Sequence, residues 1–257
     1  MVRIQETFKL KDDKIEKPEN YLGAQLSQVV IGGQTCWTML SHDYVKAAVA
    51  NVEAALDASG KRLPSRCTTP IQSNYRAELD TTPELNLKGM RYYQEQIGVL
   101  RWAVELGRVD IAMEISMLST HLAAPREGHL QQVYYCFAYL KAKPKRTLAF
   151  DSQHPTIDES RFVQFDWHDF YRGAQEPIPG DAAEPRGNAV STHFFVDADH
   201  AGSRVTRRSQ SGLLLFVNRA HILWFSKRQN TVETATFGSE FVAMRISVEF
   251  IEALRYK

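Results

Sequence analysis

The residues from His193 to His200, HFFVDADH, combine a short apolar run with two carboxylates. Alternation along a strand places Asp197 and Asp199 on the same face, together with Phe195. Two carboxylates at this spacing at a strand end suit a hard divalent cation, because such ions prefer oxygen ligands. The same pair is also typical of solvated acids at the point where a strand enters a turn.

A basic stretch follows these acids. The residues from Ala201 to Asn230 contain no Asp or Glu and six Lys or Arg, although the whole chain has a net charge of +1. Two strand-like runs, Ser211–Val217 and His221–Phe225, predict a hairpin around Asn218. An acidic strand beside a basic hairpin favours contact with phosphate groups, and a solvated charged face is the alternative. The candidate nucleic-acid-binding residues are Arg204, Arg207, Arg208, Lys227 and Arg228.

The last segment, residues 238–257, has the periodicity of an amphipathic helix. Its apolar residues recur at spacings of three and four and predict one buried stripe. They are Phe241, Met244, Val248, Ile251 and Leu254. Glu240 falls in the first turn, where the helix dipole favours an acid in any case. From that position its carboxylate could also lean over the sheet toward Asp197.

The order of these motifs resembles one known family. VDADHAG, RRSQSGLLLFV, ILWFSKRQNTV and a helix opening SEFVAM resemble, in that order, the ribonuclease H domain of Ty/copia-type retrotransposon polyproteins. Upstream, FKLKDD and YLGAQLS resemble the end of the reverse-transcriptase palm, and LSHDYVKAAVANVEAAL and CTTP resemble the thumb. YYQEQIGVLRWAVELGRVDIAMEISMLS, APREGH and YCFAYLKAKPKRTLAF resemble the connecting segment. The resemblance covers nearly the whole chain except residues 152–190.

The resemblance implies an α/β chain built from α+β pieces. Residues 1–86 would form the end of the palm, as a partial sheet, and a thumb-like region, and residues 87–150 a helical connection. Residues 151–190 would be an acidic linker rich in Pro and Gly. Residues 191–257 would be the N-terminal half of a ribonuclease H-like domain, a three-stranded antiparallel sheet plus its first helix.

The family synthesises DNA from RNA and cleaves RNA in RNA–DNA hybrids with two metal ions. By position, Asp197 matches the first catalytic carboxylate, which bridges two Mg²⁺ ions (Mn²⁺ being a substitute), and Glu240 matches the second. Asp199 matches a family position that is not a usual ligand. His200 stands where the family usually has Trp, and Ser203 where it often has Asp.

The match is incomplete, because the palm Asp-Asp motif would lie before Met1 and the later ribonuclease H carboxylates beyond Lys257. Two carboxylates are too few to hold two adjacent dications, since the ions repel strongly at that range. We therefore expect weak, single-site magnesium binding, to Asp197, Glu240 and possibly Asp199, with little or no hydrolysis. The expected partners are an RNA–DNA hybrid or template–primer and the remaining parts of a Pol polyprotein. The alternative is a non-catalytic nucleic-acid-binding or assembly module.

Composition limits the other possibilities. The chain has 257 residues and 44% hydrophobic content, enough for real cores. Its three cysteines, Cys36, Cys67 and Cys136, are widely spaced and form no CxxC pair, which argues against a zinc site or disulfides. No apolar run is long enough to span a membrane or to form a signal peptide. We expect an intracellular location, in a cytoplasmic particle or the nucleus.

Several further elements are predicted. Apolar periodicity indicates strands at Val2–Leu10, Tyr21–Ala24 and Val29–Ile31, and helices at His42–Leu56, Tyr92–Leu106, Val109–Leu122 and His129–Ala142. Ser41 is a candidate N-cap for the first of these helices. Asp166, His168 and Asp169 in the linker are a weaker candidate metal site. The first strand of the ribonuclease H-like sheet should be an unpaired edge.

Overall fold

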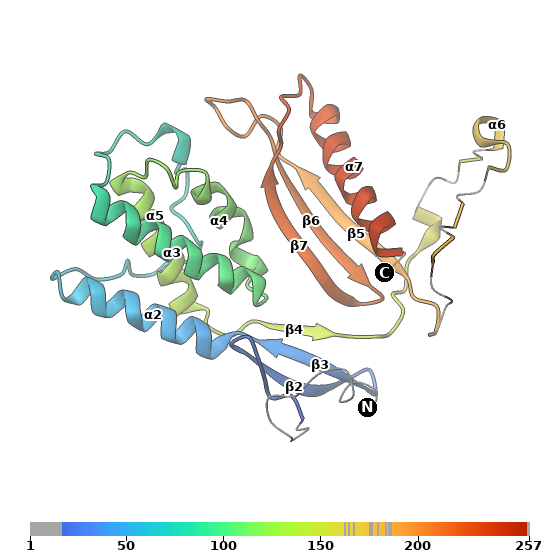
Figure 1. The fold of residues 1–257 in the computed structure, drawn as a ribbon, viewed down its shortest axis with the longest axis horizontal. Coiled ribbons are helices and arrows are strands. Elements are labelled where there is room, and N and C mark those ends of the chain that lie inside the picture. The colour runs from blue at the N-terminus through green and yellow to red at the C-terminus, as the bar shows by residue number, and fades with distance from the viewer. Residues whose placement is uncertain are drawn as a thin grey trace.

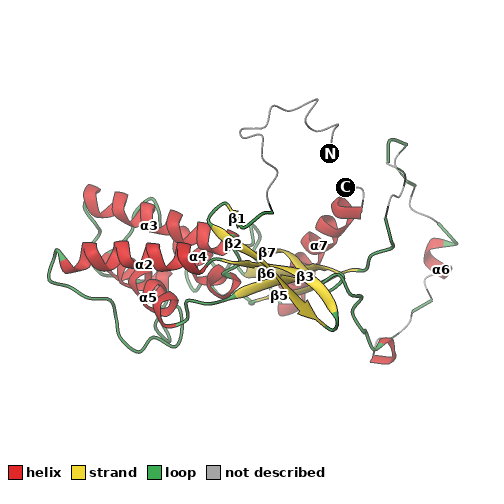
Figure 2. Cartoon of the chain, turned by 90° about the horizontal axis from the view of Figure 1, so that it is seen from below, coloured by secondary structure: helices red, strands yellow, loops and turns green. Residues whose placement is uncertain are grey.

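The computed structural model describes residues 17–255, except 162, 164, 167, 175, 176, 179, 183, 185 and 186. The described chain contains two antiparallel sheets, a group of helices and one long C-terminal helix (Figure 1). Figure 2 shows helices α2 to α5 gathered at one end of the molecule and the strands in its middle. No described helix is long and apolar enough to cross a membrane.

The first sheet has the order β1-β2-β3-β4. Its strands are β1 (Asn20–Tyr21), β2 (Ala24–Ile31), β3 (Gln34–Leu40) and β4 (Thr147–Phe150). Gly32 and Gly33 connect β2 to β3 with φ values of 57° and 82°, a conformation that glycine adopts without strain. The strand β4 was not predicted, because four residues are too few to show the alternation of apolar and polar residues by which a strand is predicted. The strand predicted at Val2–Leu10 lies outside the described residues.

The helical group consists of α2 (His42–Asp57), α3 (Leu87–Glu105), α4 (Ala112–Ser119) and α5 (Glu127–Ala142). Two 3₁₀ turns, η1 (Ala77–Leu79) and η2 (Val109–Ile111), precede α3 and α4. The buried faces of the helices form one apolar core, and the predicted positions Val45, Val52, Val133 and Phe137 all lie in it. The four predicted helices are therefore confirmed, with shifted ends.

One helix start and one predicted helix cap differ from the structure for local reasons. The helix α3 begins before Tyr92, at Leu87, because the Asn86 side chain accepts a hydrogen bond of 2.9 Å from the Gly89 N–H. Ser41 precedes α2, but its side chain does not cap the helix. Its φ and ψ of −94° and 21° lie outside the extended region from which a hydroxyl reaches back to the first turn. The capping role predicted for Ser41 is wrong.

The second sheet has the order β5-β6-β7, formed by β5 (Thr192–Ala198), β6 (Gln210–Val217) and β7 (Ala220–Arg228). The helix α7 (Thr236–Arg255) packs against it. The predicted three-stranded antiparallel sheet followed by a helix is thus present. Asn218 makes the tight β6–β7 turn with a φ of 53°, a conformation that Asn tolerates in place of Gly.

The stripe predicted to bury α7 is wrong at three positions. Phe241, Met244 and Val248 are 52%, 46% and 42% exposed. The face that meets the sheet carries small residues instead, namely Ser239, Ala243 and Ser247, all almost fully buried. Small side chains let the helix backbone approach the sheet closely, so the larger apolar residues are displaced to its outer flank.

The segment between the sheets forms few regular elements. It contains η3 (Glu159–Arg161) and α6 (His168–Tyr171), which lie apart from the rest of the chain in Figure 1. Asp151 at its start is buried and pairs with Arg219 at 3.2 Å. Cys36, Cys67 and Cys136 are buried and free of disulfides.

Candidate nucleic-acid interface and metal site

The predicted acids and cations meet at one end of the second sheet. The register pairs Ala198 with Ser211 and Gln210 with Arg228, so β5 ends where β6 begins and β7 ends. The first turn of α7 joins the same end, because His200 Nδ1 and Ser239 Oγ are 3.1 Å apart. Segments far apart in the sequence are thereby brought together. We refer to this region as the basic end of the sheet.

Asp197 lies on the face of the sheet that turns away from α7. Alternation groups it with Phe195, and both are exposed, as predicted. The opposite face carries Ser211, whose hydroxyl accepts a hydrogen bond from Gln229; the same Gln229 amide also donates to the Ser239 carbonyl of α7 at 2.8 Å. Asp197 instead borders a hollow of about 350 Å³ with Met113 of α4.

Glu240 follows the first turn of α7, rather than lying within it as predicted, because the helix begins at Thr236; its side chain is half-buried. Val242 and Ile246 of the same helix border a groove beside β7. Helical periodicity therefore turns Glu240 toward the β5 side of the sheet. Neither Asp197 nor Glu240 makes a side-chain hydrogen bond or ion pair with a residue that the structure describes. The helix α7 and the strand β5 that carry these two acids pack against each other, and a shared cation between their carboxylates stays a prediction.

Asp199 has a structural task at this end. Its carboxylate accepts a hydrogen bond from the Gln210 N–H and lies against Gly202, where a Cβ would overlap it. This contact closes the turn from β5 into the loop that carries Arg204, Arg207 and Arg208. Asp199 is therefore engaged with the backbone, and its role as a third metal ligand stays a prediction.

No group of three or more His, Cys, Asp or Glu suited to a metal ion occurs in the described part of the chain. Neither predicted set of ligands forms such a group: not Asp197 with Asp199 and Glu240, and not Asp166 with His168 and Asp169. The available donors do not fit a two-ion centre, because several anionic ligands are needed to hold two dications. Weak binding of a single Mg²⁺ stays a prediction.

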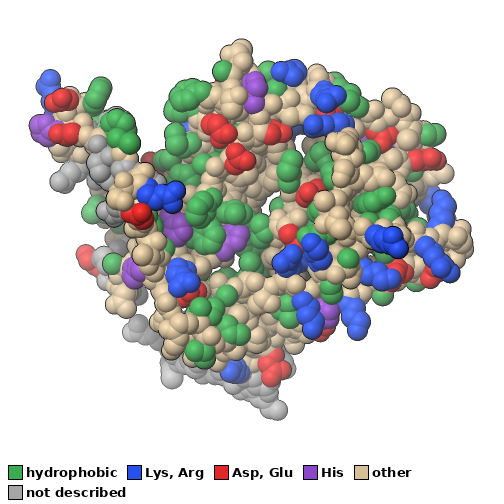
Figure 3. All heavy atoms as spheres, turned by 180° about the vertical axis from the view of Figure 1, so that it is seen from behind, with side chains coloured by type: hydrophobic (Ala, Val, Ile, Leu, Met, Phe, Trp, Pro, Cys, Tyr) green, Lys and Arg blue, Asp and Glu red, His purple; other side chains and the backbone are tan. Residues whose placement is uncertain are grey.

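The basic residues occupy two places at this end. Arg204, Arg207 and Arg208 lie in the loop between β5 and β6, rather than within the hairpin strands. Lys227 and Arg228 end β7. Figure 3 shows Lys and Arg side chains at this end of the molecule, beside a hollow between the sheet and the helical group.

A cavity of about 280 Å³ at this end is lined by Arg76, Glu78, His121, Asp199, Arg208 and Arg228, among others. Arg208 and Arg228 are half-buried. None of the three arginines forms an ion pair with an acid that the structure describes. The two carboxylates are engaged by backbone amides, Asp199 by Gln210 and Glu78 by Arg204 at 3.1 Å. The cavity therefore holds three guanidinium groups that form no ion pair with any residue the structure describes, beside two carboxylates that are bonded to backbone amides.

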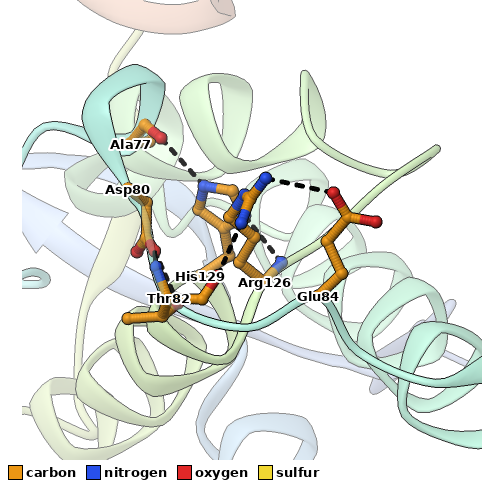
Figure 4. Close-up of polar contacts among 6 residues, drawn as sticks. All are labelled: Ala77, Asp80, Thr82, Glu84, Arg126 and His129. Atoms are coloured by element: carbon orange, nitrogen blue, oxygen red, sulfur yellow. Dashed lines mark hydrogen bonds and ion pairs between the residues drawn. The ribbon is translucent and has the colours of Figure 1, made fainter.

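The position of Arg76 is fixed by a network below η1 (Figure 4). Nε2 of His129 donates to the Ala77 carbonyl at 2.9 Å, and Nδ1 accepts from the Arg126 N–H at 3.0 Å. The Arg126 guanidinium donates to the Thr82 carbonyl at 2.6 Å and to Glu84 at 3.0 Å. This network ties residues 77–84 to the start of α5, and so holds Arg76 and Glu78 at the edge of the cavity.

His121 lines the cavity from the helical side. Its ring stacks on His129 with centroids 4.1 Å apart. Burial, and then the neighbouring His129, lower the pKa of His121 to about 4. A neutral imidazole at neutral pH can donate or accept a hydrogen bond without adding a charge. Arg76 and His121 were missed from the sequence, because neither falls in the basic stretch and only tertiary packing brings them to it.

Comparison with known proteins agrees with the resemblance at a coarse level. The chain is 25% identical over 151 residues to the retrovirus-related Pol polyprotein from transposon TNT 1-94 of Nicotiana tabacum, covering 59% of this chain and 9% of that protein. It is 23% identical over 174 residues to the corresponding polyprotein from transposon RE1 of Arabidopsis thaliana, covering 68% of this chain and 9% of that protein. The chain thus spans a small part of these relatives.

A third similar protein is of a different kind. The chain is 24% identical over 152 residues to secreted RxLR effector protein 161 of Plasmopara viticola, covering 59% of this chain and 83% of that protein. No protein-family model and no solved structure matches the chain. The chain is therefore distantly similar to Pol polyproteins of the Ty/copia retrotransposon type, over more than half of its length.

Proposed function

We propose that this chain is a nucleic-acid-binding piece derived from a retrotransposon polymerase and ribonuclease H, and that it binds an RNA–DNA hybrid or template–primer at the basic end of the sheet. The observation that carries the proposal is the cavity lined by Arg76, Arg208 and Arg228, none of which forms an ion pair within the described part of the chain. Similarity to Pol polyproteins supports nucleic acid as the anionic ligand.

The geometry explains how a phosphate backbone would be held. Guanidinium groups bind phosphate oxygens with paired N–H donors, and partial burial strengthens each contact. Arg204 and Arg207 in the exposed loop and Lys227 at the end of β7 would extend the contact along the strand of nucleic acid. Such contacts carry no base information, so the proposed binding is independent of sequence.

Salt dependence tests this function. The binding constant for a short RNA–DNA hybrid should fall with a slope of log K against log salt of about 0.7–0.9 per phosphate contacted. The double variant Arg208→Ala/Arg228→Ala should reduce that slope by the amount that corresponds to roughly one or two phosphate contacts. Arg91→Ala, at an exposed position on α3, serves as the matched control and should leave the slope unchanged. An identical slope in wild type and double variant would refute the proposal.

Hybrid cleavage is a second candidate, favoured by the contact of His200 with Ser239 that brings the end of β5 to the start of α7. Asp197 and Glu240 would then hold a single Mg²⁺ or Mn²⁺, which supplies an activated water when bound. Because the donor set is small, we propose that cleavage is weak or absent. A cleavage assay with either metal, comparing wild type with Asp197→Asn, decides this: cleavage that the variant abolishes supports an enzyme, and salt-sensitive binding alone supports a binding module.

The remaining parts of a Pol polyprotein are the proposed protein partners. They would supply the further carboxylates that a two-ion centre needs. Adding the C-terminal half of a ribonuclease H domain from a Pol polyprotein in trans and repeating the cleavage assay tests this, since activity that depends on the added segment and is lost in Asp197→Asn requires a composite site.

A further inference from the structure

A large groove lies along β7, and of the basic residues of the candidate site only Lys227 and Arg228 border it. Its volume is about 800 Å³, and its walls are α7 on one side and α3 with α4 on the other. Each residue from Trp224 to Gln229 borders it. Since successive residues of a strand point to opposite faces, a groove that all of them touch runs along the edge of the strand.

The edge of β7 offers unpaired backbone groups to this groove. The Gln229 N–H donates to the Ser209 carbonyl at 2.8 Å. Every second residue before Gln229 therefore directs its backbone N–H and C=O groups toward β6. Phe225 and Lys227 are two such residues. In an antiparallel ladder the alternate residues, Trp224, Ser226 and Arg228, direct both N–H and C=O outward. These groups have no hydrogen-bond partner among the described residues.

The walls are apolar and the rim is basic. Ala112 and Ile115 of α4 face Val242 and Ile246 of α7 across the groove. Four cations border it, namely Arg101, Lys227, Arg228 and Arg245, against two acids, Glu105 and Glu249. Glu249 is already paired with Arg245 at 2.7 Å. The groove therefore combines apolar walls with an excess of positive charge at its rim.

We infer that the edge of β7 binds an extended segment of another protein, in which apolar and acidic residues alternate, as an added strand. An exposed strand edge provides main-chain hydrogen bonds for such a segment, and pockets on alternate sides select its side chains. Apolar side chains would enter between α4 and α7, and acidic ones would meet Arg101 and Lys227. Nucleic acid is the less suitable occupant, because it lacks the alternating N–H and C=O groups that a strand edge pairs.

The inference shares Lys227 and Arg228 with the proposed nucleic-acid contact but not Arg101 or the edge of β7, so a synthetic peptide tests it separately. The probe is a capped, fluorescent peptide of about eight residues that alternates glutamate with valine or phenylalanine. Fluorescence anisotropy should show saturable binding to the full chain, and a lysine-for-glutamate peptide should bind at least about tenfold more weakly. Equal binding of the two peptides, or no binding of the acidic one, overturns the inference.

Backbone pairing is tested without altering the protein. Two further acidic peptides carry N-methyl groups on alternate residues, in opposite phases. Only the peptide whose methyl groups face β7 should lose binding, because just one side of an added strand pairs with the edge. Equal affinity of the two phases excludes strand addition.

The charge contact is tested with one variant and a matched control on the same helix. Arg101→Glu should weaken the acidic peptide by about tenfold, whereas Arg91→Glu, exposed on α3 but outside the groove, should not. Neither residue belongs to the proposed phosphate cavity, so hybrid binding should persist in both variants. Loss of single-stranded DNA binding in Arg101→Glu, with no peptide binding in wild type, would instead assign the groove to nucleic acid.

Discussion

Arg108 is a cation with none of its side chain exposed to solvent. Its guanidinium donates to both carboxylate oxygens of Asp110, at 2.9 and 2.8 Å, and the Tyr139 hydroxyl donates to the same carboxylate at 2.9 Å. Buried charges of this kind are tolerated only when paired, and removing one partner is costly. This trio links the turn before α4 to α5, and thus supports the wall of helices beside the second sheet.

The Asp110 carboxyl makes stability depend on acid pH. Burial by itself raises its pKa, but the hydrogen bonds and charge of Arg108 outweigh burial and lower the pKa below the ordinary 3.8. Between the folded and unfolded pKa values the unfolded chain binds more protons, so this contribution is present above pH 3.8 and lost as the pH falls through the lowered value. Asp80 behaves similarly, since hydrogen bonds from Thr82 and Tyr75 outweigh its burial and lower its pKa.

We therefore predict that the free energy of unfolding of wild type falls as the pH is lowered from about 5 to about 2, and that the fall is smaller in Asp110→Asn. Urea unfolding at several pH values measures it. If Asp110→Asn does not fold because Arg108 is left unpaired, the double variant Arg108→Met/Asp110→Leu removes both charges. A pH dependence in the variant equal to that of wild type would contradict the role assigned to Asp110.

At the scale of elements, α7 is held by its small residues. Ala243 is 1% exposed and lies between Ser239 and Ser247 on the face that meets the sheet. The Ser247 hydroxyl donates back to the Ala243 carbonyl at 2.9 Å, which satisfies it without a partner in the sheet. The position of Glu240, and so its separation from Asp197, follows from how closely this face approaches β5 and β6.

Overpacking this face should therefore be more damaging than polar substitution on the outer flank. Ala243→Leu is expected to destabilise the chain by about 1–3 kcal/mol, because the larger side chain forces the helix off the sheet. Met244→Gln, on the exposed flank, should change stability by less than about 0.5 kcal/mol. Urea unfolding of both variants measures the difference. A larger loss of stability in Met244→Gln than in Ala243→Leu would instead support the buried stripe that periodicity predicted.

At the scale of the whole molecule, the second sheet is joined to the helical group on its β7 side and open on its β5 side. Trp224 Nε1 donates to the Val104 carbonyl at 3.0 Å, and the Gln210 amide donates to Ser116 at 2.9 Å. On the other side, the Asp199 N–H donates to the Gln210 carbonyl. Because backbone groups alternate in direction along a strand, Val196 and every second residue from it direct their N–H and C=O groups away from β6. These groups have no hydrogen-bond partner among the described residues.

This open edge predicts self-association. β5 carries an exposed aromatic residue at its middle, Phe195 at 63%, and lies beside α7, whose outer flank is apolar. Unprotected edges of this kind pair with other chains. Sedimentation velocity should show association that increases with protein concentration in wild type and decreases in Phe195→Lys, because a charge at the edge opposes pairing.

The control for the edge is Val30→Lys, which alters an apolar residue that is 70% exposed in the first sheet, away from β5. It should leave the association unchanged. Equal effects of the two lysine substitutions would indicate general apolar adhesion rather than pairing through β5.

The sequence by itself determined the elements whose patterns are local. The periodicity of His42–Leu56 and of residues 129–142 predicts their helices and their buried residues correctly, since a helix exposes one face to a core whatever that core is. The two apolar runs around Asn218 likewise predict the β6–β7 hairpin. Alternation at the end of β5 places Asp197 and Phe195 on one face, as found.

Tertiary structure alone decided which groups meet. Periodicity gives the phase of a helix but not the side chosen for close packing, so only the structure shows that α7 approaches the sheet through Ala243 and turns Phe241 outward. Likewise, Arg76 and His121 reach the cavity of Arg208 and Arg228 through the packing of distant segments. Such contacts depend on long-range register and helix placement, which no local pattern of residues records.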